Sequence, residues 1–431
     1  MFKRRLKGSV TVFAALIFGL MIGFMSNLLS ALMIVAEKNL RRTEMHVALD
    51  SAFAEYNKAL FDTWDLFAVD MSYGGQTGDV ENVLERIRWY GDFQETPQKE
   101  AVALLSDAGG ENFLKQAEDY MLHTCRLDIP EKLLNMTGKS SASYLDNTGE
   151  ILREMEKLEL PDISLPEIPV IDEAFLKSLL ETSLSEAQVQ TETLPSRRRL
   201  KAGSMTIKRG NFEKSGLLKY IGDHFGSFID NGEGDLLYEK EYLIAGGAGD
   251  RENLLHVLRR ILVLRFADNM RLILSDAKKQ KEAAAFATGV TVVAAMPHLE
   301  EPLKYALLVA WAFAESAADT RQLLAGGKLP FPKKTSDWVT DREDIFSSSQ
   351  KKTSDAEDGY DYEMLLNLFL LAGKRDRIAL RCLDLIELDM MSREAGAGFQ
   401  CDRALVGIRV SGTFTFPRET VYKVQAQYNY R

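Results

Sequence analysis

The sequence predicts an α+β protein with a long N-terminal helix that crosses a membrane and continues as an amphipathic helix. It also predicts a helix-rich extracytoplasmic body with a small antiparallel sheet that includes a C-terminal hairpin. Three observations predict this fold class. Residues 9–36 carry no charge, residues 253–391 contain apolar segments with helical periodicity, and residues 405–430 alternate as strands do.

The apolar run Ser9–Ala36 is long enough to cross a bilayer. Its 28 residues would extend over roughly 42 Å as a helix, at about 1.5 Å per residue. Roughly 20 residues suffice for a hydrocarbon core of about 30 Å. A cleaved secretory signal is the alternative, but its apolar region is only about 7–15 residues long. We therefore expect a retained transmembrane helix over residues 9–36.

The residues before the span predict its orientation. Positive flanks stay in the cytoplasm, and four basic residues with no acid precede the span: Lys3, Arg4, Arg5 and Lys7. Lys38, Arg41 and Arg42 follow the span and reduce this asymmetry. We expect residues 1–8 to be a cytoplasmic segment and the C-terminal body to be extracytoplasmic, in a single-pass protein of the cell membrane.

Small or amide side chains recur at every fourth position inside the span: Ala15, Gly19, Gly23, Asn27 and Ala31. Small residues let two helices approach closely, and an amide can hydrogen-bond across the contact. This stripe predicts lateral self-association within the lipid bilayer. Small residues are also common in membrane helices, so a stripe without a function is the alternative.

Residues 37–70 predict that the helix continues beyond the membrane. An apolar stripe at intervals of three and four residues lies opposite a charged face. We expect the helix to end near Asp62, followed by a short strand over Leu66–Val69. The stripe packs either on the core of its own domain, which we favour, or in a coiled coil with a partner chain. Its members are Met45, Leu49, Phe53, Tyr56, Leu60, Trp64 and Phe67.

Residues 71–203 are predicted as an extracytoplasmic mixed region with a proline-rich linker at Pro161–Pro169. The segments Val80–Phe93 and Lys99–Leu105 predict two short helices or a helix and a strand, and Glu111–Cys125 predicts a helix. The basic cluster Arg197–Arg199 predicts a solvated loop, with a phosphate or lipid headgroup as its alternative partner.

Residues 204–431 are predicted as a helical core that ends in the hairpin. Helices are expected over Asn253–Leu274, Ala283–Met296, Leu303–Leu324, Tyr362–Leu371 and Asp376–Met391. The uncharged runs in the second and third of these are only about 10–14 residues long, so buried core helices are favoured over a second membrane hairpin.

The glycine turn at Gly246–Gly249 matches neither a phosphate loop nor a dinucleotide loop. We expect Asp250 and Asn253 to cap the helix after it. The polar segment Lys333–Asp361 predicts a mobile surface loop.

The C-terminal segments Leu405–Phe416 and Thr420–Tyr430 alternate and are rich in β-branched and aromatic residues. They predict two strands joined at Pro417–Glu419. We expect this hairpin to pair with the strand over Leu66–Val69.

The composition excludes several function classes. The 431-residue chain has a formal net charge of −10, which argues against nucleic acid as a partner. Its three cysteines have no metal or redox spacing; either Cys382 and Cys401 form a disulfide or all three, with Cys125, are buried thiols. The five histidines are scattered, and no G-x-S-x-G motif occurs. We expect no cofactor, no metal and no enzymatic activity.

The opening Gly8–Ala14 (GSVTVFA), followed by a long apolar helix, looks like the start of pilin-like proteins of Tad/Flp pilus systems, the TadE/TadG type. Further segments resemble an uncharacterised single-pass family found in Firmicutes beside such loci: Leu49–Tyr56, Asp65–Asp70, Glu241–Gly247, Ala310–Glu315, Leu323–Gly327 and Asp384–Asp389. The resemblance implies a role in a surface pilus or secretion apparatus, with other membrane proteins of that apparatus as partners.

The resemblance also implies a processing site. In prepilins a peptidase cuts after the glycine, here between Gly8 and Ser9, and a glutamate at the fifth residue beyond the cut supports assembly. In this chain the fifth position is Phe13, and the span contains no acid. A carboxylate in lipid is costly and is kept for a partner. We therefore expect a minor or accessory component rather than a major pilin.

The sequence thus predicts a membrane-anchored structural or accessory component, minor pilin-like, of a Tad/Flp-type pilus or secretion apparatus. The alternative is an anchored extracytoplasmic sensor or hydrophobic-ligand-binding protein. A deep apolar pocket between the helices around Val292 and Val309 would favour that alternative.

Overall fold

The structure is a computed structural model that describes residues 7–75, 78–124, 173–180, 184–205, 214–345, 351, 353, 355–356, 359–393, 398–416 and 420–430. The linker Pro161–Pro169, Cys125 and the hairpin turn Pro417–Glu419 lie outside the described residues. The chain divides into two units. Unit 1 comprises Met1–Asp107, Lys201–Lys208 and Glu394–Arg431, and unit 2 comprises Ala108–Leu200 and Arg209–Arg393.

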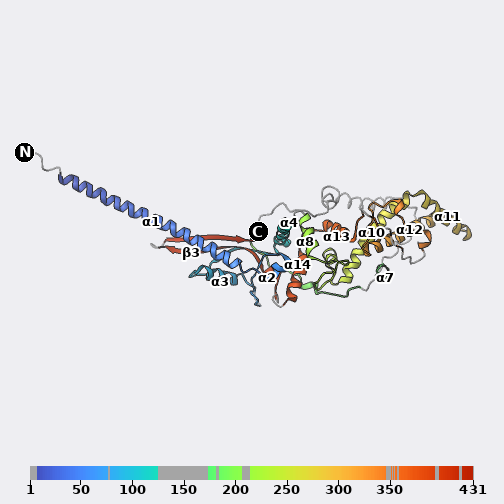
Figure 1. The fold of residues 1–431 in the computed structure, drawn as a ribbon, viewed down its shortest axis with the longest axis horizontal. Coiled ribbons are helices and arrows are strands. Elements are labelled where there is room, and N and C mark those ends of the chain that lie inside the picture. Colours follow the sequence, from blue (N-terminus) through green and yellow to red (C-terminus); the bar gives the residue numbers. More distant parts are fainter. Residues whose placement is uncertain are drawn as a thin grey trace, which may run out of the picture. The chain divides into compact units, whose positions relative to one another are not determined.

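Unit 1 combines a long helix with a four-stranded antiparallel sheet, which confirms the predicted α+β class (Figure 1). Its helices are α1 (Lys7–Phe53), α2 (Lys58–Trp64) and α3 (Val80–Gly91). Its strands are β1 (Val69–Asp70), β2 (Gln98–Leu104), β3 (Ala404–Phe416) and β4 (Thr420–Asn429). Strand β3 pairs with the other three, so both ends of the chain contribute to one sheet.

The predicted hairpin is confirmed as β3 and β4, which pair from Gly407 opposite Asn429 to Phe416 opposite Thr420. The short N-terminal strand is displaced from Leu66–Val69 to Val69–Asp70, but it pairs with β3 as expected, with Val69 opposite Leu405.

Helix α1 has an uncovered apolar part and a packed part. Its most apolar window has a mean hydropathy of 2.2 and no buried residue, so α1 fits a membrane anchor by length and composition. Further along, Met45, Leu49 and Phe53 are at most 1% exposed and pack against α3 and the sheet. The apolar stripe of this helix therefore packs on the core of its own unit.

Helix α1 ends at Phe53 rather than near Asp62. The backbone leaves the helix at Ala54, and a new helix, α2, starts after Asn57. Asn57 Oδ1 accepts the N–H of Leu60 at 3.1 Å, and the Asn57 N–H donates to the carbonyl of Ala68 at 2.8 Å. An amide that caps a new helix competes with continuation of the old one.

Gly412, in β3, leaves room for a side chain of α1. An added Cβ there would lie 2.7 Å from Met45 Cε. The Met45 side chain therefore reaches the sheet at this glycine.

Unit 2 is helical. Its described helices are α4 (Asp107–Thr124, which begins at the unit boundary), α7 (Glu173–Ser178), α8 (Lys214–His224), α9 (Glu239–Ala245), α10 (Asp250–Ser275), α11 (Ala277–Val293), α12 (Glu300–Leu324), α13 (Tyr362–Ala372) and α14 (Arg375–Ser392). Helices α10, α11 and α12 share a core that includes Ala283, Leu308 and Trp311. Among the described residues, α1 is the one helix long and apolar enough to cross a membrane.

Candidate functional site

The predicted membrane-helix residues lie on the uncovered part of α1. An added Cβ at Gly19 or Gly23 would meet no atom within 4 Å, so this part of the helix surface is open. Association through Ala15, Asn27 and Ala31 with these glycines stays a prediction. Gly8 and Ser9 lie in the first turn of α1, and processing between them also stays a prediction.

The end of the β3–β4 hairpin contacts α1 just beyond the apolar run. Lys38 Nζ lies 4.6 Å from the ring centre of Tyr422, and Arg42 donates to the Tyr422 hydroxyl at 3.5 Å. The Arg41 guanidinium lies 5.6 Å from the ring centre of Phe414. We call Lys38, Arg41, Arg42, Phe414 and Tyr422 the collar. Basic and aromatic side chains are typical of a membrane–water interface.

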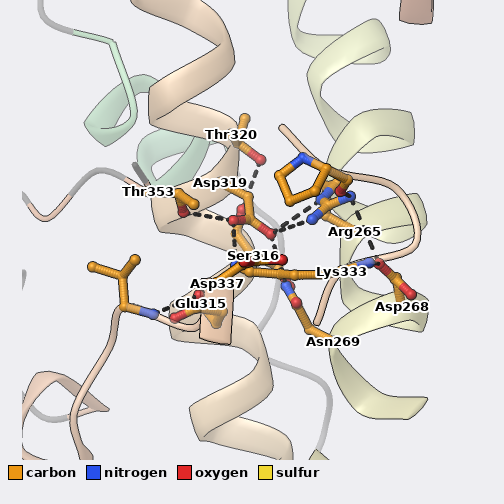
Figure 2. Close-up of polar contacts among 12 residues, drawn as sticks. Arg265, Asp268, Asn269, Glu315, Ser316, Asp319, Thr320, Lys333, Asp337 and Thr353 are labelled. Carbon is orange, nitrogen blue, oxygen red and sulfur yellow. Dashed lines mark hydrogen bonds and ion pairs between the residues drawn. The ribbon is translucent and has the colours of Figure 1, made fainter. Parts of the chain in front are cut away.

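A buried network of polar and charged side chains connects α10, α12 and the segment between α12 and α13 (Figure 2). Asp319 lies at its centre. Arg265 donates to Asp319 Oδ2 through Nε and Nη2, at 3.0 and 2.9 Å. Lys333 Nζ and Thr353 Oγ1 donate to Oδ1 at 2.6 and 2.7 Å, and Asn269 donates to Oδ2 at 3.0 Å.

Glu315 extends this network to the backbone of the segment. Lys333 Nζ donates to Glu315, which also accepts the N–H groups of Val339 and Thr340 at 3.0 and 2.8 Å. Burial disfavours the charged form of Asp319, but the charges of Arg265 and Lys333 outweigh it, so the pKa of Asp319 lies below its usual range. The paired charges are closed to solvent, and each holds another part of the chain.

The prediction of a mobile surface loop over Lys333–Asp361 is therefore wrong for three of its residues. Lys333, Thr340 and Thr353 are 2–3% exposed. Their polar groups bind buried carboxylates on α12, and no sequence pattern reveals that pairing.

The network also positions an aromatic wall. Arg265 Nη1 donates to the carbonyl of Pro330 at 3.3 Å, and its guanidinium lies 5.7 Å from the ring centre of Phe331. Leu329 and Tyr360 exchange two backbone hydrogen bonds of 2.9 and 2.7 Å. Phe331 then meets Tyr360 edge to face, with ring centres 6.0 Å apart.

Phe331 and Tyr360 form one wall of an open groove of about 690 Å³ between α10 and α13, called the groove below. Helices α10 and α13 supply the rest of its apolar lining: Val263, Leu264, Leu365, Leu368, Phe369 and Ala372. On its other face, α13 buries Leu366 and Leu370. Leu365 and Leu368, at the floor of the groove, are buried as well, whereas Phe369 is half-buried and Ala372 is exposed.

The described lining of the groove contains no acidic side chain and five basic ones: His256, Arg259, Arg260, Lys374 and Arg377. Arg260, Lys374 and Arg377 have no ion-pair partner in the part of the chain that the structure describes. Burial, and then the charge of Arg377, lower the pKa of Arg260. Lys374 and Arg377 also lie at the start of α14, where the helix dipole disfavours cations. The rim of the groove is therefore positive.

A second cavity, of about 1030 Å³, lies in front of the glycine turn and has both acidic and basic lining residues. The predicted cap is wrong here: Gly249 is the N-cap, and Asp250 accepts the N–H groups of Leu237 and Tyr238 at 3.0 and 3.1 Å. Asn253 accepts the N–H of Gly247 at 2.6 Å. Side chains of α10 thus fold back to hold the preceding loop, and these N–H groups are occupied.

The short helix α9 carries two buried carboxylates, Glu239 and Glu241. Burial raises the pKa of Glu239 and of Glu241 to about 7. Glu241 accepts the Tyr362 hydroxyl at 2.6 Å and the Phe228 N–H at 3.0 Å.

One basic residue predicted to be solvated is paired in unit 2. Arg198 binds Glu387, with Nη2 2.9 Å from Oε2. The solvated-loop prediction is therefore wrong at Arg198, because a carboxylate from α14 lies opposite it.

The cysteines follow the buried-thiol alternative where they are described. Cys382 and Cys401 are buried free thiols. Across the described ranges, no group of three His, Cys, Asp or Glu side chains is arranged to hold a metal ion.

A family model matches residues 170–416, more than half of the 431-residue chain. The chain belongs to DUF5702. It is a family of unknown function. The DUF5702 match includes α10, α13 and the start of α14, and so all residues that line the groove, whereas α1 lies outside it. No curated protein and no solved structure matches the chain.

Sequence reasoning did not identify the groove. Arg259 and Arg260 were visible as charges within an apolar helix, but such charges ordinarily mark a solvent face. Their proximity to Lys374 and Arg377 depends on the packing of helices more than 100 residues apart in the sequence.

Proposed function

We propose that this DUF5702 member is a membrane-anchored structural or accessory component, minor pilin-like, of a Tad/Flp-type pilus or secretion apparatus. The main support for the proposal is that α1 has two parts with different surroundings. One continuous helix contains a bilayer-length apolar part with no protein around it and a second part whose Met45 and Phe53 belong to a folded core. Such a helix fixes a folded unit directly to the membrane.

The same helix supports the proposed orientation and partners. The basic residues before the span favour a cytoplasmic N-terminus and an extracytoplasmic body. The open surface at Gly19 and Gly23 would allow close contact with another membrane helix. We propose other membrane proteins of the apparatus, or a second copy of this chain, as the occupant.

A role without catalysis is part of the proposal. The charged cluster around Asp319 and Lys333 is buried and internally paired. It stabilises the fold and has no access for a substrate.

Affinity purification and deletion test this proposal. The tagged full-length chain should co-purify from membranes with pilus-assembly or secretion proteins, and its deletion should abolish surface fibres or secretion. A matched control replaces residues 9–36 with polyleucine of equal length; it should remain in the membrane and lose those partners. Normal fibres and secretion in the deletion strain would rule the proposal out.

An anchored extracytoplasmic ligand-binding protein is the second candidate function. The structure does not place a deep pocket at Val292, because this side chain is 68% exposed. The groove between α10 and α13 favours the second candidate instead, since it is apolar, of small-molecule size and positive at its rim.

A further inference from the structure

We propose that the groove binds a single-chain amphiphile with an anionic head group. The apolar chain would lie against α10 and α13, and the head group would bind the cations at the rim. This inference goes beyond the structural role proposed above and does not depend on it.

The apolar lining defines the chain-binding part. Leu365 and Leu368 form a floor that is 6–8% exposed, Val263 lies at the open side, and Phe331 and Tyr360 form a wall. Small-ligand sites have volumes of roughly 300–1,000 Å³, and the groove, at about 690 Å³, lies within this range. A single acyl chain suits this volume better than the helix of a partner protein, which is about 10 Å across with its side chains.

The rim defines the head group. Arg260 and Arg377 repel each other, and neither has an internal counter-ion among the described residues. The whole chain has a net charge of −10, so a rim whose described charged residues are all basic is a local feature. An anionic head group would relieve the repulsion and form charge-assisted hydrogen bonds with the guanidinium groups. A neutral apolar ligand would leave these cations without a function.

The buried network makes the groove pre-formed. Arg265 lies on α10, close after Val263 and Leu264, and holds Pro330 and the ring of Phe331. Asp319 and Lys333 fix Arg265 and the segment that carries Phe331. The wall is therefore set before a ligand arrives, which lowers the entropic cost of binding.

Photo-crosslinking tests the site in the full-length chain. The protein is placed in phosphatidylcholine nanodiscs with a photoactivatable C16 fatty acid, and labelled peptides are identified by mass spectrometry. Saturable labelling of the α10 segment around Val263 and of the α13 segment around Phe369 is expected. Palmitic acid should compete, and methyl palmitate, which lacks the charge, should compete at least tenfold more weakly.

Two variants and a control separate the parts of the proposal. Arg260→Gln with Arg377→Gln should weaken binding about tenfold, because two of the rim cations are lost while Arg259 and Lys374 remain. Val263→Trp should abolish labelling by filling the groove. Lys278→Gln with Lys281→Gln removes the same charge from exposed positions on α11, outside the groove, and should bind as the wild type does. Unchanged thermal unfolding confirms that each variant is folded.

The result also identifies the head group. If lysophosphatidic acid competes more strongly than palmitic acid, the preferred head group is a phosphate. If palmitic acid competes more strongly, it is a carboxylate. The proposal is overturned by labelling that does not saturate, by equal competition from the methyl ester, or by wild-type binding in the double rim variant.

Discussion

At the scale of single residues, Lys333 has the largest expected effect on stability. Its ammonium group is fully buried between Glu315 and Asp319. Removing one partner of a buried ion pair leaves an uncompensated charge, which costs about 3–5 kcal/mol. We expect Lys333→Met to lower the free energy of unfolding by that amount in urea titrations followed by tryptophan fluorescence, since Trp311 and Trp338 lie nearby.

The control for this prediction is Lys328→Met. Lys328 is exposed and lies in the same segment of the chain. Its replacement should change stability by no more than about 0.5 kcal/mol. Equal effects of the two variants would show that the network does not hold the segment.

The carboxyl groups of α9 predict a pH dependence. Burial raises the pKa of Glu241 from 4.5 to about 7. The folded state then binds more protons than the unfolded state between pH 4.5 and 7, so the stability from this group is present below pH 4.5 and is lost as pH rises through about 7. Glu241→Gln mimics the protonated form and should flatten the fall in melting temperature between pH 5 and 8.

Glu239 has the same shift to about 7, so the wild type combines both contributions. Each has an upper limit of about 3 kcal/mol at 1.36 kcal/mol per pKa unit. Glu233→Gln, at an exposed position in the same region, should leave the profile unchanged. A wild-type slope in Glu241→Gln would mean that this carboxyl group is ionised throughout the range.

At the scale of secondary-structure elements, the packing of α1 on the hairpin would set the depth of unit 1 at the proposed membrane. The collar starts two residues after Ala36, and Arg42 is six residues beyond it, so the collar lies roughly 3–9 Å above the apolar run at about 1.5 Å per residue. Each headgroup layer is about 5–7 Å thick. Tyr422 and the exposed Val421 would therefore lie at headgroup depth.

This depth can be measured with a polarity-sensitive probe in the membrane-bound protein. A probe at Val421→Cys should be quenched by headgroup spin labels. A probe at Asp62→Cys serves as the control, because α2 lies near Tyr430 through Phe61 and Phe67, at the other end of β4. Tyr430 is nine residues along the strand from Val421, or about 30 Å at 3.3 Å per residue. Equal quenching at both positions would contradict the proposed depth.

At the scale of the whole molecule, the state of the N-terminus decides between a retained anchor and a processed pilin. A retained anchor keeps residues 1–8, whereas prepilin-type processing between Gly8 and Ser9 removes them. For the retained anchor that we expect, the intact mass of the protein from membranes should correspond to the full 48.4 kDa chain. A mass reduced by residues 1–8 would contradict the retained anchor and support a pilin-like maturation.

The sequence by itself determined the features that depend on local periodicity. The apolar run, the stripe through Met45, helices α10 to α14 and the C-terminal hairpin could be predicted, because each repeats a burial pattern with the period of a helix or a strand. Periodicity does not determine where a helix begins or ends when a hydrogen bond of one side chain sets that boundary. Asn57 ends one helix by capping another, and Asp250 binds a preceding loop rather than its own helix.

Only the tertiary structure decided the long-range pairings. Lys333 meets Asp319, Arg198 meets Glu387 and Arg260 lies near Arg377 across chain separations that no periodic pattern encodes. A charged residue looks the same in sequence whether it is solvated, paired in the interior or left at the rim of a groove. Packing between distant helices determines which of these occurs, because it decides whether water, a carboxylate or another cation is its neighbour.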